Sequence, residues 1–250
     1  MLCIRSCKSG HRWVPVTLCD STDHTMSLDK RRVLLSWSSG KDSAWCLDVL
    51  NQQADIEVVG LLTTFNESAD RVAMHAVRKS LVERQAESVG LPLFPVWLPW
   101  PCPNEAYEDA MESALRRIGK QLDVTTVAFG DLFLEDIRAY RKDQMAAWGT
   151  SALFPIWKSA TSQLALRMID AGLKAYLTCV DPRQCPVEFA GRLYDQELLN
   201  DLPESVDPCG EHGEFHSFVF DGPMFDTAID VKVGETIEQD GFVFSDVIPI

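Results

Sequence analysis

The sequence predicts an α/β protein that joins a parallel-sheet domain to a smaller α+β domain. Short apolar runs alternate with helix-like patterns from residue 33 onward, which is typical of a parallel sheet covered by helices. Near the C-terminus, apolar and polar residues alternate around turn signals instead, which indicates antiparallel strands. The first pattern predicts strands at residues 33–37, 56–64, 93–97, 124–129 and 174–180. It predicts helices near residues 43–52, 72–89, 104–120 and 160–171.

The helix predicted over residues 72–89 has the clearest period. Its core-facing positions step by three or four residues, through Met74, Val77, Leu81, Gln85 and Val89. Gly90 follows this helix and Gly172 follows the helix near residues 160–171. A glycine commonly ends a helix because it adopts the left-handed conformation readily.

The C-terminal part has strand-like alternation at residues 215–220 and 229–248. Gly234 and the pair Asp240-Gly241 are turn signals inside the second stretch, so we expect an antiparallel hairpin there. The change of pattern places the first domain at residues 30–150 and the second at residues 151–250.

Composition excludes several classes of function. The formal net charge is -14, from 37 acidic and 23 basic residues, and this balance opposes direct binding to nucleic acid. No apolar run approaches the ~20 residues of a membrane helix. The eight cysteines include no CxxC pair, so we read them as free thiols in a cytoplasmic protein.

Residues 1–29 mix cysteine, basic residues and serine without periodicity. We expect a disordered tail or a misassigned start, since Met26 lies just before the first strand. A targeting segment is the alternative, although the stretch lacks the apolar core of a signal peptide.

The loop "SWSSGKDS", residues 36–43, follows the first predicted strand and precedes the first predicted helix. A Walker loop has a Gly five residues before its Gly-Lys pair and Ser or Thr after the Lys, but Leu35 and Asp42 occupy those places here. Unpaired N–H groups at the start of a helix still favour a phosphate. The residues that would contribute are Ser38, Ser39, Gly40, Lys41 and Ser43. Asp42 either caps the helix or binds Mg²⁺.

Ligands of parallel sheets bind outside the carboxyl ends of the strands, so residues 38–43, 63–67 and 130–136 should border the site. Thr63 and Thr64 end the second predicted strand, where they either border a nucleotide or simply suit a strand. Gly130 and Asp131 follow the fourth predicted strand. Asp131 either contacts Mg²⁺ or substrate or caps a helix. Asp136, with Glu135 and Arg138 nearby, either contacts Mg²⁺ or substrate or is a solvated carboxylate.

The loop resembles the Ser-Gly-Gly-x-Asp-Ser motif of the PP-loop ATP pyrophosphatases, with Ser39 replacing the first Gly. Further blocks in matching order resemble the diphthine–ammonia ligase family, at residues 67–93, 128–141, 179–182, 189–195 and 207–223. The most diagnostic block is Gly210–Ser217, in which His212 stands where Asn is common and Ser217 where Thr is common.

The resemblance implies a Rossmann-like ATP-binding domain and ATP-dependent amidation of a carboxylate. The carboxylate would attack the α-phosphate, pyrophosphate would leave, and ammonia would displace AMP. Implied cofactors are ATP and Mg²⁺, with Asp42 and Asp131 as the expected metal ligands. The acceptor would be diphthine on an elongation factor.

The resemblance also implies residue roles. Expected catalytic residues are Lys41, Asp42, Asp131, Glu214 and His216, with Glu214 or His216 taking a proton from the ammonia. His75 and the loop residues would contact ATP. Expected substrate contacts are Glu135, Asp136, Arg138, Glu211, Gly213, Glu214 and His216.

Four alternatives stay open. A related bacterial enzyme would amidate a small acid instead, and a non-catalytic protein would only bind ATP or AMP. Cys209, His212 and His216 have a spacing that also suits zinc. Cys102, Cys179 and Cys185 would suit sulfur transfer, which the acidic charge disfavours. Assembly into a homo-oligomer is compatible with each of these.

Overall fold

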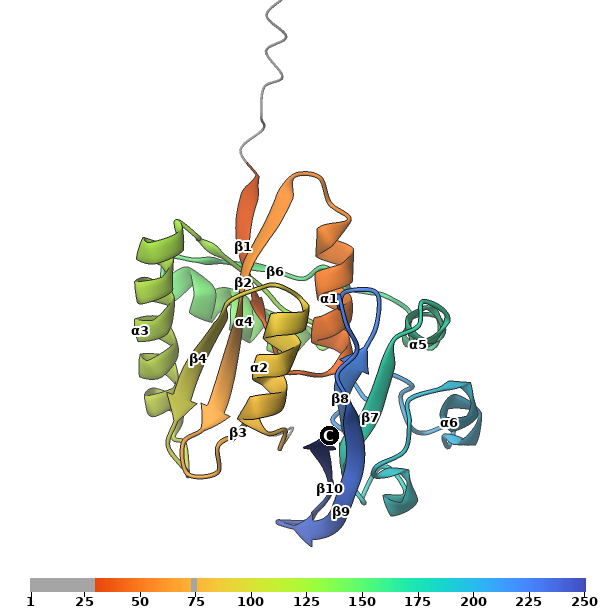
Figure 1. Ribbon diagram of the computed structural model, residues 1–250. Helices are drawn as coiled ribbons and strands as arrows, with labels where there is room; N and C mark the ends of the chain where they lie inside the picture. Colours follow the sequence, from red (N-terminus) through yellow and green to blue (C-terminus); the bar gives the residue numbers. More distant parts are fainter. Residues whose placement is uncertain (1–29, 73–75) are drawn as a thin grey trace, which may run out of the picture.

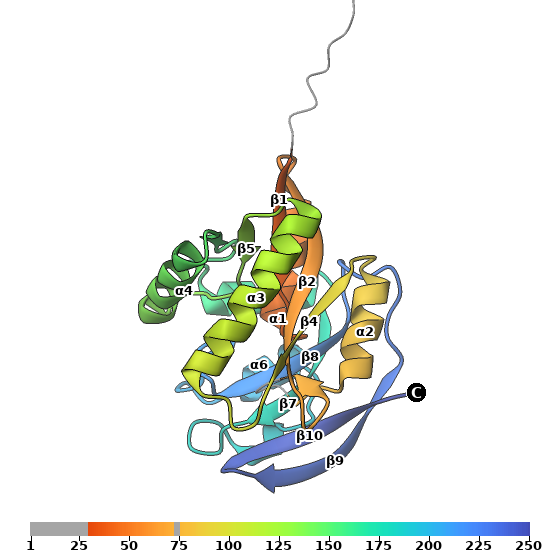
Figure 2. The ribbon, with the colours of Figure 1, turned by 90° about the vertical axis from the view of Figure 1, so that its left-hand side faces the viewer.

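The computed structural model describes residues 30–72 and 76–250. The segment 1–29 and the predicted ATP contact His75 lie outside the described residues. The described residues form two units, each built around its own sheet (Figures 1 and 2). This arrangement confirms an α/β sheet unit followed by a unit with an antiparallel sheet.

The first sheet has the order β3-β2-β1-β5-β6, and β4 also pairs with β2. All pairs are parallel except the short β2–β3 pair. Its strands are β1 (Arg31–Ser36), β2 (Ile56–Asn66), β3 (Arg71–Val72), β4 (Leu93–Leu98), β5 (Thr126–Ala128) and β6 (Ser151–Leu153). Both faces of β1 are buried, as its continuous apolar sequence requires.

Helices cover both faces of this sheet (Figures 1 and 2). They are α1 (Lys41–Asn51), α2 (Lys79–Ser88), α3 (Asn104–Leu122) and α4 (Glu135–Ala147). Val33 and Leu35 pack in one core cluster with the buried residues of α1 and α2. Leu34 points to the other face, where it joins Ile118 of α3 and Met145 of α4. Alternate residues of one strand therefore serve two cores.

The second sheet is antiparallel and has the order β8-β7-β10-β9. Its strands are β7 (Lys174–Val180), β8 (Phe215–Asp221), β9 (Val231–Gln239) and β10 (Phe242–Pro249). The helices of this part are α5 (Thr161–Asp170), η1 (Val187–Phe189) and α6 (Gln196–Asp201). The hairpin predicted at residues 229–248 is confirmed, with Asp240 and Gly241 at its turn in the left-handed conformation.

The helix predicted over residues 72–89 is wrong in its first half. Val72 lies in β3, and the helix begins only at Lys79. Ala76 has a φ of 54°, which a right-handed helix does not accommodate, and Arg78 is extended and bridges to Arg71. The apolar spacing includes Val77, which is buried in the core although it does not lie in a helix. The sequence reading missed α4 and β6.

The buried side chain of Gln85 joins the two units beside the phosphate loop. Gln85 of α2 accepts a hydrogen bond from Trp37 Nε1 at 2.8 Å. Its Nε2 donates to the carbonyl oxygens of Ser39, at 3.0 Å, and Val219, at 2.6 Å. Since β6 completes the first sheet, we propose that the boundary between the units lies between Leu153 and Thr161. No helix within 30–72 and 76–250 is long and apolar enough to cross a membrane.

Candidate active site

The phosphate loop lies between the end of β1 and the start of α1, as the sequence predicts. Gly40 is the N-cap of α1, and its backbone is extended. Ser38 and Ser43 face each other with hydroxyl oxygens 3.2 Å apart, and Ser43 Oγ donates to the Gly40 carbonyl at 2.9 Å. These contacts hold the two hydroxyls beside the first turn of α1, where backbone N–H groups attract an anion.

Ser39 departs from the motif at a conformationally demanding position. Its φ is 70°, which favours glycine, and the residue is fully buried. Its hydroxyl oxygen has no hydrogen-bond partner among the described residues. Its carbonyl accepts from Val219 N at 3.0 Å and from Gln85 Nε2. A glycine would adopt this left-handed backbone more readily than Ser39, and the second unit holds the conformation in place.

Lys41 is buried where the two units meet, with 2% exposure. Its ammonium lies 2.8 Å from Asp42 Oδ2 and donates to the Cys209 carbonyl. It also lies 5.7 Å from the Tyr194 ring centroid and 5.5 Å from that of Phe215. Burial lowers the pKa of Lys41, but the neighbouring Asp42, Cys209 and Asp207 together outweigh burial and raise it. Burial raises the pKa of Asp42, although the nearby Lys41 ammonium opposes this rise.

Gly130 brings the end of β5 against the start of α1. A Cβ at Gly130 would lie 3.1 Å from the Asp42 carbonyl carbon and 3.3 Å from Asp42 Cβ. Only a glycine leaves room for this approach without moving Asp42. Next to it, Asp131 accepts a hydrogen bond from Arg141 Nε at 2.7 Å, which fixes the carboxylate.

Glu211 ties the second unit to the loop after β5. Its Oε1 accepts from the backbone N–H groups of Leu132, at 2.8 Å, and Phe133, at 3.1 Å. Burial raises the pKa of Glu211, and the charges of Asp42 and Asp131 add to the rise. Glu211, Asp42 and Asp131 therefore lie within electrostatic reach of one another, although they are far apart in sequence.

Glu214 stabilises the loop that contains it. It is 2% exposed and accepts from the backbone N–H groups of Asp207, at 3.0 Å, and His212, at 2.8 Å. His216 lies on β8, opposite Cys179 of β7. Burial, together with the charge of Lys41, lowers the pKa of His216 to about 4. At neutral pH this imidazole is therefore uncharged. Gly213, just before Glu214, has a φ of 82°.

The remaining predicted residues are more dispersed. Thr63 donates its hydroxyl to the Trp37 carbonyl at 2.8 Å, while Thr64, next along β2, is half-buried. Glu135 and Asp136 lie exposed in the first turn of α4. The Arg138 guanidinium lies 4.5 Å from the Trp157 ring centroid, and its Nε is buried without a partner among the described residues.

Sequence reasoning missed several residues that assemble the site. Ser217 accepts a hydrogen bond from the backbone N–H of Lys41 at 3.2 Å, and so reaches the first residue of α1. Asp207 accepts from Cys209 N at 2.8 Å, and Tyr194 donates to the Pro208 carbonyl at 2.7 Å. The sequence does indicate a role for Gln85. A Gln on the apolar face of a helix has a buried amide, and a buried amide needs hydrogen-bond partners.

The two alternatives based on cysteine gain no support. No group of three or more His, Cys, Asp or Glu side chains within the described ranges could hold a metal ion. Cys209 Sγ instead donates to the Thr161 carbonyl at 3.4 Å. Burial raises the pKa values of Cys179 and Cys209 to about 12 and that of Cys185 to about 11. Since the thiolate is the reactive form, these thiols are poor nucleophiles.

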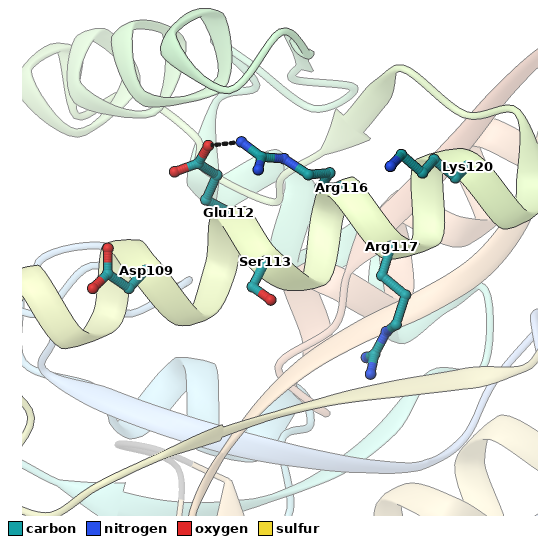
Figure 3. A pocket seen from close by; sticks show the side chains of 6 residues that line it. All are labelled: Asp109, Glu112, Ser113, Arg116, Arg117 and Lys120. Atoms are coloured by element: carbon teal, nitrogen blue, oxygen red, sulfur yellow. Dashed lines mark hydrogen bonds and ion pairs between the residues drawn. The ribbon is translucent and has the colours of Figure 1, made fainter.

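A hollow of about 540 Å³ along the outer face of α3 is separate from these loops (Figure 3). Its acidic side chains lie toward the N-terminal end of the hollow and its basic side chains toward the C-terminal end, and Arg116 pairs with Glu112. Its lining residues are Asp109, Glu112, Ser113, Arg116, Arg117 and Lys120. We assign no ligand to this mixed-charge face.

Both units of this chain match domains of known proteins. Residues 31–146 match the diphthamide synthase N-terminal domain, and residues 160–246 match the diphthamide synthase C-terminal domain. A diphthine–ammonia ligase from Danio rerio is 26% identical over 238 residues. That alignment covers 86% of this chain and 92% of the relative.

Proposed function

The chain belongs to the diphthamide synthase family, and from this premise we propose that it is an ATP-dependent amide ligase. It would adenylate a carboxylate, release pyrophosphate and then form the amide with ammonia. One observation carries the proposal. The phosphate loop, the loop after β5 and the Asp207–Ser217 segment meet at the start of α1 through the contacts of Gly130, Glu211 and Ser217.

The phosphate loop would hold ATP through the first N–H groups of α1 and the hydroxyls of Ser38 and Ser43. Asp42 and Asp131 are suitable carboxylates for a Mg²⁺ ion, which proteins commonly bind with one or two carboxylates plus phosphate oxygens. When bound, this ion would neutralise charge on the phosphates. Arg141 would keep the Asp131 carboxylate oriented toward that task.

Lys41 would act mainly through position. Its ammonium lies against Asp42 and the Cys209 carbonyl, so it fixes the Asp42 carboxylate and joins the loop to the second unit. In this geometry Lys41 positions Asp42. Its ammonium would contact a phosphate only after it had moved away from the Cys209 carbonyl.

Given the geometry, we propose roles for Glu214 and His216 that differ from the proton-accepting roles first expected. Both oxygens of Glu214 accept backbone N–H groups, so we assign Glu214 to shaping the loop. His216, with a pKa of about 4, is too weak a base to take a proton from an ammonium ion. We assign it the role of a neutral polar contact near the site. Ammonia would then enter the reaction already deprotonated.

The acceptor we propose is diphthine, the substrate in the name of the relative from Danio rerio, carried on an elongation factor. The acidic charge of this chain, -14, suits a basic partner surface. A small carboxylic acid is the second candidate acceptor, because a shared fold and shared ATP chemistry do not fix the acceptor.

The test is product analysis with ATP, Mg²⁺, ammonia and either the diphthine-bearing elongation factor or candidate small acids. The proposal expects AMP and pyrophosphate in equal amounts, formed only when an acceptor is present. ADP as the product would contradict it. Tight ATP binding without turnover on every acceptor would favour a protein that only binds the nucleotide.

Asp131→Asn and Asp136→Asn form a matched pair for the same assay. Asp131 is half-buried and bound to Arg141, whereas Asp136 is exposed five residues further on. We expect AMP formation to fall by about 100-fold or more for Asp131→Asn, on the scale of losing a metal ligand or its equivalent. Because Asp136 is exposed, we do not assign it the substrate contact first expected, and Asp136→Asn should keep most of the activity. Equal losses would remove Asp131 from the proposed site.

A further inference from the structure

The peptide group between Ser39 and Gly40 decides which polar group the phosphate loop presents to an anion. In a trans peptide the carbonyl and the following N–H point in opposite directions. The Ser39 carbonyl points toward the second unit, where it accepts from Val219 N at 3.0 Å. The Gly40 N–H points the other way, toward Ser38 Oγ at 3.4 Å. A reversed peptide would instead present a carbonyl oxygen to the phosphate and repel it.

Ser39 does not favour this backbone conformation by itself. Its φ of 70° is left-handed, which is costly for any residue except glycine. Its hydroxyl has no hydrogen-bond partner within residues 30–72 and 76–250, so its own side chain adds no hydrogen bond that would hold the peptide. The conformation therefore depends on the groups that bind the Ser39 carbonyl.

Gln85 is placed to hold that carbonyl. Its side chain is fully buried, and Nε2 donates to the carbonyls of Ser39 and Val219. Its Oε1 accepts from Trp37 Nε1. These contacts fix the amide, because a rotated amide would place Oε1 against two carbonyl oxygens. Gln85 and Val219 N together use both lone pairs of the Ser39 carbonyl.

We propose that Gln85 is a positioning residue for ATP, which holds the Ser39–Gly40 peptide so that the Gly40 N–H faces the phosphates. It would act through Ser39 rather than by contact with the nucleotide. Val219 belongs to β8, so this arrangement needs β8 beside the phosphate loop, and the second unit thereby takes part in ATP binding. The inference rests on the ATP-binding role in the proposed function.

Calorimetric binding of ATP with Mg²⁺ to the full chain tests this role. Gln85→Met keeps a long unbranched side chain and removes the amide. Gln85→Glu keeps the shape but replaces the donor by an oxygen that would face two carbonyl oxygens. We expect the Kd for ATP to rise at least about tenfold in both variants, because the loop loses a buried hydrogen bond that selects its binding conformation. An unchanged Kd in folded variants would overturn the proposal.

Ser88, at the end of the same helix, provides the matched control. Its hydroxyl also joins the two units, since it donates to the Thr227 carbonyl and accepts from Thr227 N at 3.2 Å. Ser88→Ala should lower the Tm but keep the Kd for ATP, because these contacts lie outside the phosphate loop. If it weakens ATP binding as much as Gln85→Met does, general loosening between the units sets the affinity, and the specific role of Gln85 is wrong.

A double variant tests whether Gln85 acts through Ser39. Glycine adopts the left-handed conformation at little cost, so Ser39→Gly should restore about fivefold in ATP affinity to Gln85→Met. In the parent chain the same change should alter the Kd by less than about twofold, because Gln85 already holds the peptide. Equal effects of Ser39→Gly in the two backgrounds would show that Gln85 does not act through Ser39.

The parent chain separates this inference from the proposed function. In the AMP-forming assay, Gln85→Met should raise the KM for ATP and change kcat by less than about threefold. ATP binding by the parent that Gln85→Met does not weaken would defeat the role of Gln85 while the ligase proposal stands. Absence of ATP binding by the parent would defeat the proposed function, and this inference with it.

Discussion

The phosphate loop and a cavity of about 580 Å³ between the β9–β10 hairpin and the ends of β2 and β4, which we name the hairpin cavity, lie along the same edge of the first sheet. Different parts of the chain build them. Backbone groups and close approach form the loop: Ser39 is fully buried, and a Cβ at Gly130 would lie only 3.1 Å from the Asp42 carbonyl carbon. Side chains form the cavity, and Trp100 in its lining is 68% exposed. ATP chemistry should therefore tolerate almost no change at the loop, while cavity substitutions should leave the loop unchanged.

Gly130 gives the largest expected effect on the loop side of this comparison. In Gly130→Ala the new Cβ would meet Asp42 at 3.1 to 3.3 Å, and Gly130→Val adds branches in the same space. We expect AMP formation to fall modestly in the Ala variant and by about 100-fold or more in the Val variant, because Asp42 moves. Steady-state AMP assays measure this series.

The control for this series is Glu235→Gln in the lining of the hairpin cavity, assayed with saturating acceptor. It should keep kcat, since no backbone group of the loop depends on it. Circular dichroism establishes that each variant is folded. A Gly130→Val protein with unchanged AMP formation would show that the loop after β5 does not contribute to the site.

His216 should have an effect of intermediate size among these predictions. We expect it to make the free energy of unfolding depend on pH. Its folded pKa of about 4 lies below the unfolded value of about 6.5. As pH falls below about 6.5, the unfolded chain binds a proton that the folded chain does not, so stability falls until pH reaches about 4. The loss amounts to at most about 3 kcal/mol.

His216→Gln, which does not titrate, should flatten the stability profile between pH 6.5 and 4. Urea unfolding at several pH values measures this difference. A variant that keeps the slope of the parent would mean that other groups cause it, and that the environment of His216 is more polar than its burial suggests.

Ser39 gives the smallest expected effect. Ser39→Gly removes about 1 kcal/mol of strain from the left-handed backbone, and it removes a buried hydroxyl that has no partner among residues 30–72 and 76–250. Glycine costs about 0.5–1 kcal/mol in the unfolded chain, so the net gain should be about 1 kcal/mol. Thermal unfolding measures it, and a lower Tm would show that the hydroxyl has a binding partner in the folded protein.

The sequence predicted the fold class and most elements because burial imposes a regular period on helices and strands. It failed around Ala76, where the helical spacing of apolar residues continued through a turn with a positive φ. It also missed α4, which begins in a polar stretch and buries only Met145. Periodicity reports which residues are buried, and it detects a turn only when a turn residue marks it.

For the candidate site, the sequence predicted the phosphate loop, Gly130, Asp131 and Glu211. It did not predict that Ser217 reaches the backbone of Lys41, or that Gln85 joins Ser39 to Val219. These contacts join residues more than 40 positions apart, and no local pattern reports such pairs. The expected proton-accepting roles of Glu214 and His216 depended on surroundings that only the fold supplies.

The sequence by itself determined the strand–loop–helix unit at residues 31–51, because local backbone preferences and apolar spacing suffice for it. It also determined the family through blocks of characteristic residues. Only the tertiary structure decided that Lys41 is buried against Cys209, and that β9 and β10 enclose a cavity beside β2 and β4. Burial and charge pairing arise from the packing of two units, and packing depends on contacts between segments that are distant along the chain.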